Sequence, residues 1–230
     1  MSERLNDVAA VVFDLDDTLY PERAYVQSGF RAVSRQIALL EPDLEGQAVY
    51  EQLLRAFEEG ERGTVFGRVL EELGRKADDQ EMAELVSLYR CHRPVLELEE
   101  PVRWMLEQLG GKYKLGLLTD GTLPGQKLKV EALGLEGKFD HIVYTEELGR
   151  QYWKPAVRGF EEMASQLGCA HEQCVYIADN PSKDFLGPNA LGWQSVQVAR
   201  PERVHLEVLV PPDGQAQRVV GVVTDVLQVL

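Results

Sequence analysis

The sequence has 230 residues, which allows one large domain or a core with an inserted module, given a typical domain of roughly 150 residues. Hydrophobic residues make up 44% and charged residues 27% of the chain, a balance that suits a buried core and excludes a disordered or fibrous protein. The formal net charge of −14 repels nucleic-acid phosphates and anionic membranes, so we expect no nucleic-acid partner and no membrane partner.

The sequence also carries signals about the cellular compartment. No apolar run approaches the roughly 20 residues that a membrane span needs, and no secretory signal is visible at the N-terminus. The three cysteines are an odd number and lack metal-site spacing, so we expect reduced thiols. These features predict a cytoplasmic protein, and they do not indicate an oligomeric state.

Short apolar runs rich in β-branched residues predict strands buried on both faces. The first run covers residues 9–15, and similar runs follow at 114–119, 142–145, 174–178 and 195–199. We also expect an edge strand at 218–223. Apolar residues recur at spacings of three and four within 102–109 and 157–167, which predicts helices between strands. The alternation predicts the α/β class, with a doubly wound parallel sheet of the Rossmann-like kind.

The region 21–98 interrupts this alternation. It shows helical periodicity without a convincing strand, and its length of about 75 residues suits a small domain. We therefore predict an α/β core made of residues 1–20 and 99–230, with a helical domain at 21–98 inserted after the first strand.

Carboxylates gather where the predicted strands end. Asp14 and Asp16 follow the first strand, and Asp179 and Asp184 follow the strand at 174–178. In a parallel sheet these ends share one edge, and such carboxylates could not all stay ionised without a cation. Oxygen ligands favour a hard divalent ion, and we expect Mg²⁺.

The same edge carries groups suited to phosphoryl transfer. Asp14 and Asp16 are two residues apart, so in extended chain they share a face, where one can act as a nucleophile and the other can carry a proton. Thr119, at the end of the second strand, and Lys154 would supply hydrogen bonds and positive charge to a phosphate.

Four segments resemble, in order and spacing, the four motifs of the haloacid dehalogenase (HAD) superfamily. They are FDLDDTLY at 13–20, LLTDG at 117–121, WKP at 153–155 and YIADNPSKD at 176–184. The insert at 21–98 resembles the helical cap of that superfamily, so the resemblance extends over essentially the whole chain. It implies a HAD catalytic core with an inserted cap domain.

The resemblance also implies a role for each motif residue. Asp14 would be the nucleophile, Asp16 the general acid and base, and Lys154 would neutralise the nucleophile and the phosphate. The phosphate would bind Thr119, Lys154 and the backbone amide of Asp120, which stands where asparagine is common in the family. The implied metal site comprises Asp14, Asp16 through its backbone carbonyl, Asp179, and Asp184, which binds through water or orients Lys154.

These expectations combine into a predicted function. We expect a magnesium-dependent phosphatase that hydrolyses a small phosphomonoester, such as a sugar phosphate, nucleotide or phosphorylated acid, through an aspartyl-phosphate intermediate. Its partner would be a small phosphorylated metabolite, and Arg62, in a loop of the cap, is a candidate specificity residue. The alternatives are a phosphomutase of the β-phosphoglucomutase type and, with less support, a 2-haloacid dehalogenase or an inactive binding module.

Overall fold

The computed structural model describes residues 5–60, 63–206 and 208–230. The chain divides into two compact units, one formed by residues 1–23 and 97–230 and the other by residues 24–96. These boundaries lie within a few residues of the predicted ones. The role of the smaller unit as a cap stays a prediction.

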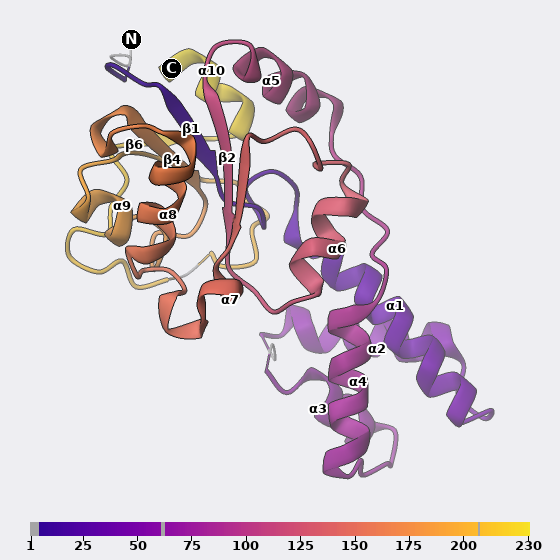
Figure 1. Cartoon of the computed structure of the whole chain (residues 1–230). Coiled ribbons are helices and arrows are strands. Elements are labelled where there is room, and N and C mark those ends of the chain that lie inside the picture. The colour runs from indigo at the N-terminus through magenta and orange to yellow at the C-terminus, as the bar shows by residue number, and fades with distance from the viewer. Residues whose placement is uncertain (1–4, 61–62, 207) are drawn as a thin grey trace. The chain divides into compact units, whose positions relative to one another are not determined.

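The larger unit is built on a parallel sheet of six strands (Figure 1). Along the sheet the order is β3-β2-β1-β4-β5-β6, and every neighbouring pair is parallel. The predicted fold class, an α/β doubly wound sheet, is confirmed. The strands are β1 (Ala10–Phe13), β2 (Lys114–Thr119), β3 (His141–Tyr144), β4 (Cys174–Ala178), β5 (Gln194–Val198) and β6 (Arg218–Val220).

Helices cover both faces of this sheet. Connections between parallel strands are right-handed, so the direction in which the chain moves along the sheet decides which face a connecting helix covers. From β1 through β2 to β3 the chain moves toward one edge, which places α5 and α6 on one face. It then returns to β4 and moves toward the opposite edge, which places α8 and α9 on the other face. Phe160 and Met163 of α8 pack against alternate side chains of β1 and β4, such as Val12 and Tyr176. The helices of this unit are α5 (Glu100–Gly110), α6 (Gly125–Ala132), α7 (Thr145–Leu148), α8 (Arg158–Leu167), α9 (Leu186–Ala190) and α10 (Val226–Val229).

The helix α6 was absent from our sequence prediction. Its buried residues include Gln126 and Lys129, so the side that faces the protein carries polar groups and gives no apolar stripe in the sequence. The signal that was available is topological, since two adjacent parallel strands need a crossover, which is usually a helix.

Strand order reverses between β1 and β4, and this junction positions the polar loops. The backbone N–H of Asp14 donates to the carbonyl of Ile177 at 2.9 Å, so the loop after β1 begins beside the last residues of β4. Ligands of open α/β sheets bind at such a switch point, beyond the carboxyl ends of the strands.

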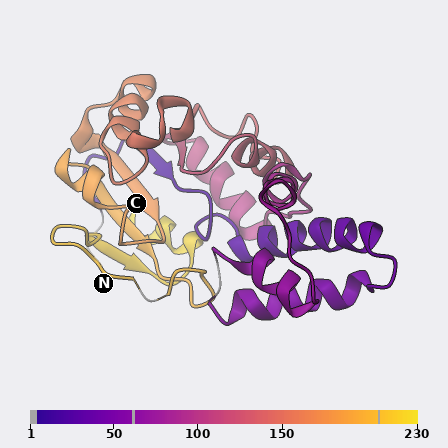
Figure 2. The same ribbon diagram turned by 90° about the horizontal axis from the view of Figure 1, so that it is seen from below.

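In the described part of the smaller unit, all regular secondary structure is helical. Phe30, Leu53, Val69 and Leu85, one from each helix, belong to one apolar cluster. Figure 2 views these helices from below, in indigo to magenta. They are α1 (Glu22–Leu40, whose first two residues belong to the larger unit), α2 (Gly46–Glu58), α3 (Val65–Glu72) and α4 (Asp79–Cys91). Among the described residues of the whole chain, no helix combines the length and the apolar character needed to cross a membrane.

Candidate active site

A cavity of about 380 Å³ lies at the carboxyl edge of the sheet in the larger unit. The loops that follow β1, β2 and β4 line it, at the edge of the sheet where the sequence predicts that the carboxylates gather. Its lining includes the predicted residues Asp14, Asp16, Asp120, Lys154 and Asp179.

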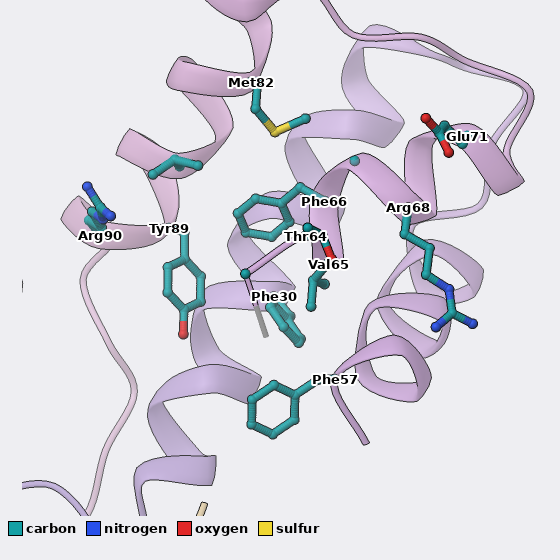
Figure 3. Close-up of a pocket in the computed structure, with 13 residues that line it drawn as sticks. Phe30, Phe57, Thr64, Val65, Phe66, Arg68, Glu71, Met82, Tyr89 and Arg90 are labelled. Atoms are coloured by element: carbon teal, nitrogen blue, oxygen red, sulfur yellow. The ribbon is translucent and has the colours of Figure 1, made fainter. Parts of the chain in front are cut away.

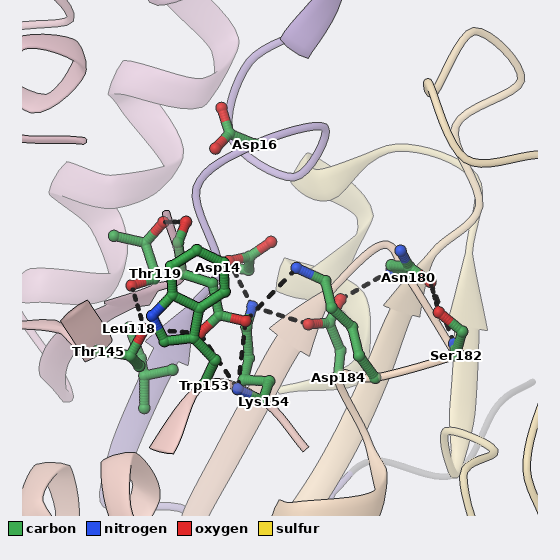
Figure 4. Close-up of polar contacts among 12 residues, drawn as sticks. Asp14, Asp16, Leu118, Thr119, Thr145, Trp153, Lys154, Asn180, Ser182 and Asp184 are labelled. Atoms are coloured by element: carbon green, nitrogen blue, oxygen red, sulfur yellow. Dashed lines mark hydrogen bonds and ion pairs between the residues drawn. The ribbon is translucent and has the colours of Figure 1, made fainter. Parts of the chain in front are cut away.

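The ammonium group of Lys154 joins two of the predicted carboxylates (Figure 4). Its Nζ atom lies 2.7 Å from Oδ1 of Asp14 and 2.7 Å from Oδ1 of Asp184, and donates to the hydroxyl of Tyr176 at 3.0 Å. Burial opposes the charge of Lys154, but Asp14 and Asp184 outweigh it and hold the pKa of Lys154 well above its usual range. Lys154 is therefore a buried, permanently charged group beside the predicted nucleophile.

Three carboxylates form a compact buried cluster. Asp14, Asp179 and Asp184 each offer an oxygen atom, and these atoms lie within 4.8 Å of one another. Burial, with Asp184 and Asp14 nearby, raises the pKa of Asp179 to about 9, and burial raises the pKa of Asp14 to about 6, against the pull of Lys154. Oδ2 of Asp179 is buried without a hydrogen-bond partner among the described residues. An all-oxygen set with an orphaned, charge-crowded carboxylate fits a hard divalent cation.

Asp184 is held in place by hydrogen bonding from its own loop. Its Oδ2 accepts the backbone N–H of Asn180 at 2.9 Å, while its Oδ1 lies beside Lys154. The resemblance implies that Asp184 either binds a metal through water or orients Lys154. The contact with Nζ of Lys154 is consistent with the second of these roles.

Asp120 uses its side chain to brace the site. Its Oδ1 accepts the hydroxyl of Thr145 at 2.7 Å, and its two oxygens lie 3.2 Å from the backbone nitrogen of Lys154, which donates to them. Lys183 Nζ lies 3.6 Å from Oδ2. The carboxylate of Asp120 thus accepts hydrogen bonds from the protein and lies near one lysine. Binding of phosphate by the backbone amide of Asp120 stays a prediction.

Asp16 lies apart from the Asp14–Lys154–Asp184 cluster (Figure 4). Its carboxylate accepts from Lys129 Nζ at 2.8 and 2.9 Å, from Gln126 Nε2 at 3.0 Å, and from the hydroxyl of Tyr20. Burial alone would raise the pKa of Asp16, but Lys129 and these hydrogen bonds lower it below its usual value. The side chain of Asp16 does not belong to the carboxylate cluster, and a metal-binding role for its backbone carbonyl stays a prediction.

Thr119 is buried and connected to the same group of residues as Asp16. Its Oγ1 accepts from Gln126 Nε2 at 2.7 Å, the amide that also donates to Asp16. Gln126 and Lys129 are site residues that the sequence analysis missed, because both lie on the unpredicted helix α6.

Asp17 fixes the loop after β1. Its Oδ1 accepts the backbone N–H of Glu22 at 2.8 Å, and its Oδ2 accepts that of Val204 at 2.5 Å. Glu22 itself and His205, which follows Val204 in the sequence, both line the cavity. Burial, together with Asp16, raises the pKa of Glu22 to about 7. The lining thus includes polar residues that no motif signalled.

The predicted cap residue Arg62 lies outside the described residues. A separate cavity of about 830 Å³ is present within the helical unit (Figure 3). Its lining includes the aromatic side chains Phe30, Phe57, Phe66 and Tyr89. Its Arg68 is paired with Glu59 and Glu72. The described residues of its lining offer no carboxylate cluster, so the cavity of the larger unit is the candidate active site.

Comparison with known proteins establishes the family. Residues 8–192 match the family of haloacid dehalogenase-like hydrolases, and the chain belongs to it. The recognition made from the four motifs is confirmed.

The curated relatives include two phosphatases of the same name. The glyceraldehyde 3-phosphate phosphatase of Methanopyrus kandleri is 31% identical, with 84% of each chain covered. The enzyme of the same name from Methanothermobacter thermautotrophicus is 28% identical, over 86% of this chain and 90% of its own length. Among solved structures, the HAD hydrolase YfnB of Bacillus subtilis, bound to magnesium, shares the fold with a TM-score of 0.75 and 22% identity, over 98% of this chain and 99% of its own.

Proposed function

We propose that the chain is a magnesium-dependent phosphatase that hydrolyses a small phosphomonoester through a phosphorylated Asp14. The observation that carries the proposal is the position of Lys154, whose Nζ lies 2.7 Å from both Asp14 and Asp184. A buried ammonium at this place can attract a phosphoryl group to the nucleophile and neutralise the charge that develops in transfer.

Two half-reactions follow from the placement of the two carboxylates. In the first, an oxygen of Asp14 attacks phosphorus and the bond to the leaving oxygen breaks. Asp16, which must enter this step protonated although Lys129 favours its carboxylate form, gives the leaving oxygen its proton. In the second, Asp16 takes a proton from water, the water oxygen attacks phosphorus, and the bond to Asp14 breaks. Phosphate leaves and both carboxyl groups return to their starting forms.

The cluster of Asp14, Asp179 and Asp184 would hold the divalent ion. Magnesium, when bound there, would neutralise the crowded carboxylates and polarise the phosphoryl oxygens. The family includes a solved structure bound to magnesium, which supports this choice of ion. Thr119, the backbone amide of Asp120 and Lys154 would bind the phosphoryl oxygens.

The substrate we propose is a short phosphorylated sugar or aldehyde. Two relatives that cover most of the chain are named glyceraldehyde 3-phosphate phosphatases. The cavity in the larger unit, at about 380 Å³, is at the small end of the usual range for ligand sites.

A panel of phosphorylated metabolites tests this function. We expect the purified chain with Mg²⁺ to release phosphate from glyceraldehyde 3-phosphate at a higher kcat/KM than from nucleoside monophosphates or phosphorylated acids. Asp14→Asn should lower turnover by at least about 1,000-fold, because it removes the nucleophile. The matched control is Asp213→Asn, which changes an exposed aspartate of the same unit and should retain full activity.

Other outcomes would change the proposal. Full activity in excess chelator, or unchanged turnover in Asp14→Asn, would refute the mechanism. Conversion of a sugar monophosphate into its isomer without release of phosphate would identify a phosphomutase, and release of halide from a 2-haloacid would identify a dehalogenase.

A further inference from the structure

Helix α6 presents two polar residues to the general acid and base of the proposed reaction. Lys129 is buried, and its Nζ donates to both carboxylate oxygens of Asp16 at 2.8 and 2.9 Å. Burying an ammonium costs several kcal/mol unless it is paired. The fold meets that cost by placing the ammonium directly on Asp16.

Gln126 links Asp16 to the predicted phosphate site. Its Nε2 donates to Oδ2 of Asp16 at 3.0 Å and to Oγ1 of Thr119 at 2.7 Å. A single buried amide thus fixes the distance between the proton-transferring carboxylate and the phosphate-binding hydroxyl.

The turn before α6 is shaped to admit this amide. Gly121 has φ of +141°, and a Cβ atom built there would lie 2.7 Å from Cδ of Gln126. Only glycine leaves the room that Gln126 occupies at this place. A side chain at position 121 would therefore displace the amide of Gln126 from its present place.

The resulting place of Asp16 suits in-line transfer. Asp14 and Asp16 line the same cavity, yet Asp16 lies apart from the cluster that surrounds Asp14 (Figure 4). In phosphoryl transfer the attacking and leaving oxygens lie on opposite sides of phosphorus. A proton donor for the leaving oxygen must therefore be held away from the nucleophile, with the phosphoryl group between them.

We propose that Lys129 and Gln126 are positioning residues that hold the carboxylate of Asp16 where it meets the leaving oxygen. This inference rests on the proposed phosphatase function, since it assigns residues to the proton transfer of that reaction. In this role Lys129 acts through Asp16, and Gln126 acts through Asp16 and Thr119.

The dependence of rate on the leaving group tests the role. An alkyl phosphate such as glycerol 3-phosphate needs a proton on its leaving oxygen, whereas the leaving group of 2,4-dinitrophenyl phosphate departs as a stable anion. We expect Lys129→Met to lower kcat/KM about 100-fold for the alkyl ester, the usual size of a misplaced acid. For the dinitrophenyl ester we expect a loss of about threefold or less. Gln126→Leu should shift the two rates in the same direction by a smaller factor.

Two variants control for a general loss of structure. Lys129→Arg retains a cation that can reach Asp16 and should recover most of the alkyl-ester rate. Lys127→Met removes a lysine from the same helix that pairs instead with Glu147 at 2.6 Å on the surface, and should match the unmodified chain on both esters.

Several results would overturn the inference. These are equal losses on the two esters for Lys129→Met, no loss on either, a gain in rate, or no recovery in Lys129→Arg. If Lys129→Met does not fold, Gln126→Leu must show the leaving-group selectivity by itself, while Lys129→Arg stays close to the unmodified chain on both esters. If the unmodified chain hydrolyses no phosphomonoester, the proposed function itself fails, which is a distinguishable result.

Discussion

The Nζ atom of Lys154 lies 2.7 Å from Oδ1 of Asp184, and both side chains are withdrawn from solvent. The same nitrogen is equally close to Asp14, so one buried cation balances two buried carboxylates. Removing one partner of a buried ion pair leaves uncompensated charge and costs about 3 kcal/mol or more.

Lys154→Met should therefore destabilise the fold as well as the chemistry. We expect its free energy of unfolding in urea, measured in chelator, to fall by about 3 kcal/mol. Lys138→Met, which breaks the surface pair with Glu107, should change it by less than about 1 kcal/mol. Equal losses of unfolding free energy in the two variants would show that Lys154 does not stabilise the fold by balancing the charges of Asp14 and Asp184.

Binding of magnesium should stabilise the protein through Asp179. Its Oδ2 has no hydrogen-bond partner among the described residues, and its pKa is raised to about 9 by burial and by Asp184 and Asp14. At 100 times its dissociation constant, an ion that binds only the folded state adds about 2.7 kcal/mol, or about 5–10 °C in Tm for a chain of this size.

A thermal unfolding series at constant ionic strength checks this prediction. The increase of Tm with Mg²⁺ should disappear in Asp179→Asn and persist in Glu161→Gln, which alters an exposed carboxylate. A Tm increase of the same size in Asp179→Asn would place the ion elsewhere.

The sheet could be predicted because its strands are buried on both faces. Val11, Val12 and Phe13 of β1 are fully buried, so the strand reads as a continuous apolar run with a sharp polar end at Asp14. Parallel strands bring such ends to one edge, and this made the gathering of Asp14 and Asp179 predictable from strand order. Lys154 follows no strand end, and its role was indicated by the resemblance of the WKP segment.

The contacts of Asp16 and Asp17 could not be predicted in this way. The partners of Asp16 on α6 are more than 100 residues away, and Val204, which donates to Asp17, is 187 residues away. Gln126 and Lys129 read as solvated residues, because burial of a polar group depends on a partner that only the tertiary structure supplies.

Gly187 lets α9 approach the segment that carries Lys154. A Cβ atom built at Gly187 would lie 2.8 Å from the backbone oxygen of Pro155 and 2.9 Å from Cε2 of Phe160. Because one of these atoms is backbone, rotation of a side chain cannot relieve the contact, and the segment beside Lys154 must move. We expect Gly187→Ala to cost about 1–3 kcal/mol in urea unfolding and to lower kcat.

Gly110→Ala provides the control for Gly187→Ala. Its added Cβ would meet Cδ1 of Leu115 at an ordinary 3.5 Å, at the end of helix α5, so stability should stay equal or rise slightly. Unchanged stability and kcat in Gly187→Ala would show that the packing of α9 on this segment is loose.

Asp140 should make the stability of the sheet depend on pH. Its Oδ2 accepts the backbone N–H of Leu115 at 2.9 Å, and this bond, followed by Lys114, lowers the pKa of Asp140 below its usual 3.8. A lowered folded-state pKa adds stability that is present above the unfolded value and is lost as the pH falls through the folded value. The side chain is 41% exposed, so the contribution at pH 7 should be about 1 kcal/mol or less.

Urea unfolding of Asp140→Asn between pH 7 and pH 3 measures this contribution. The variant should be less stable than the unmodified chain at pH 7, and the gap should narrow below pH 3.8 as Asp140 becomes protonated in both states of the unmodified chain. Lys114→Met should show a smaller gap, because it leaves the bond to Leu115 intact and removes only an exposed partner. A gap of constant size across the whole range would mean that the Asn variant loses packing rather than charge, and that the carboxylate of Asp140 is not what ties its loop to β2.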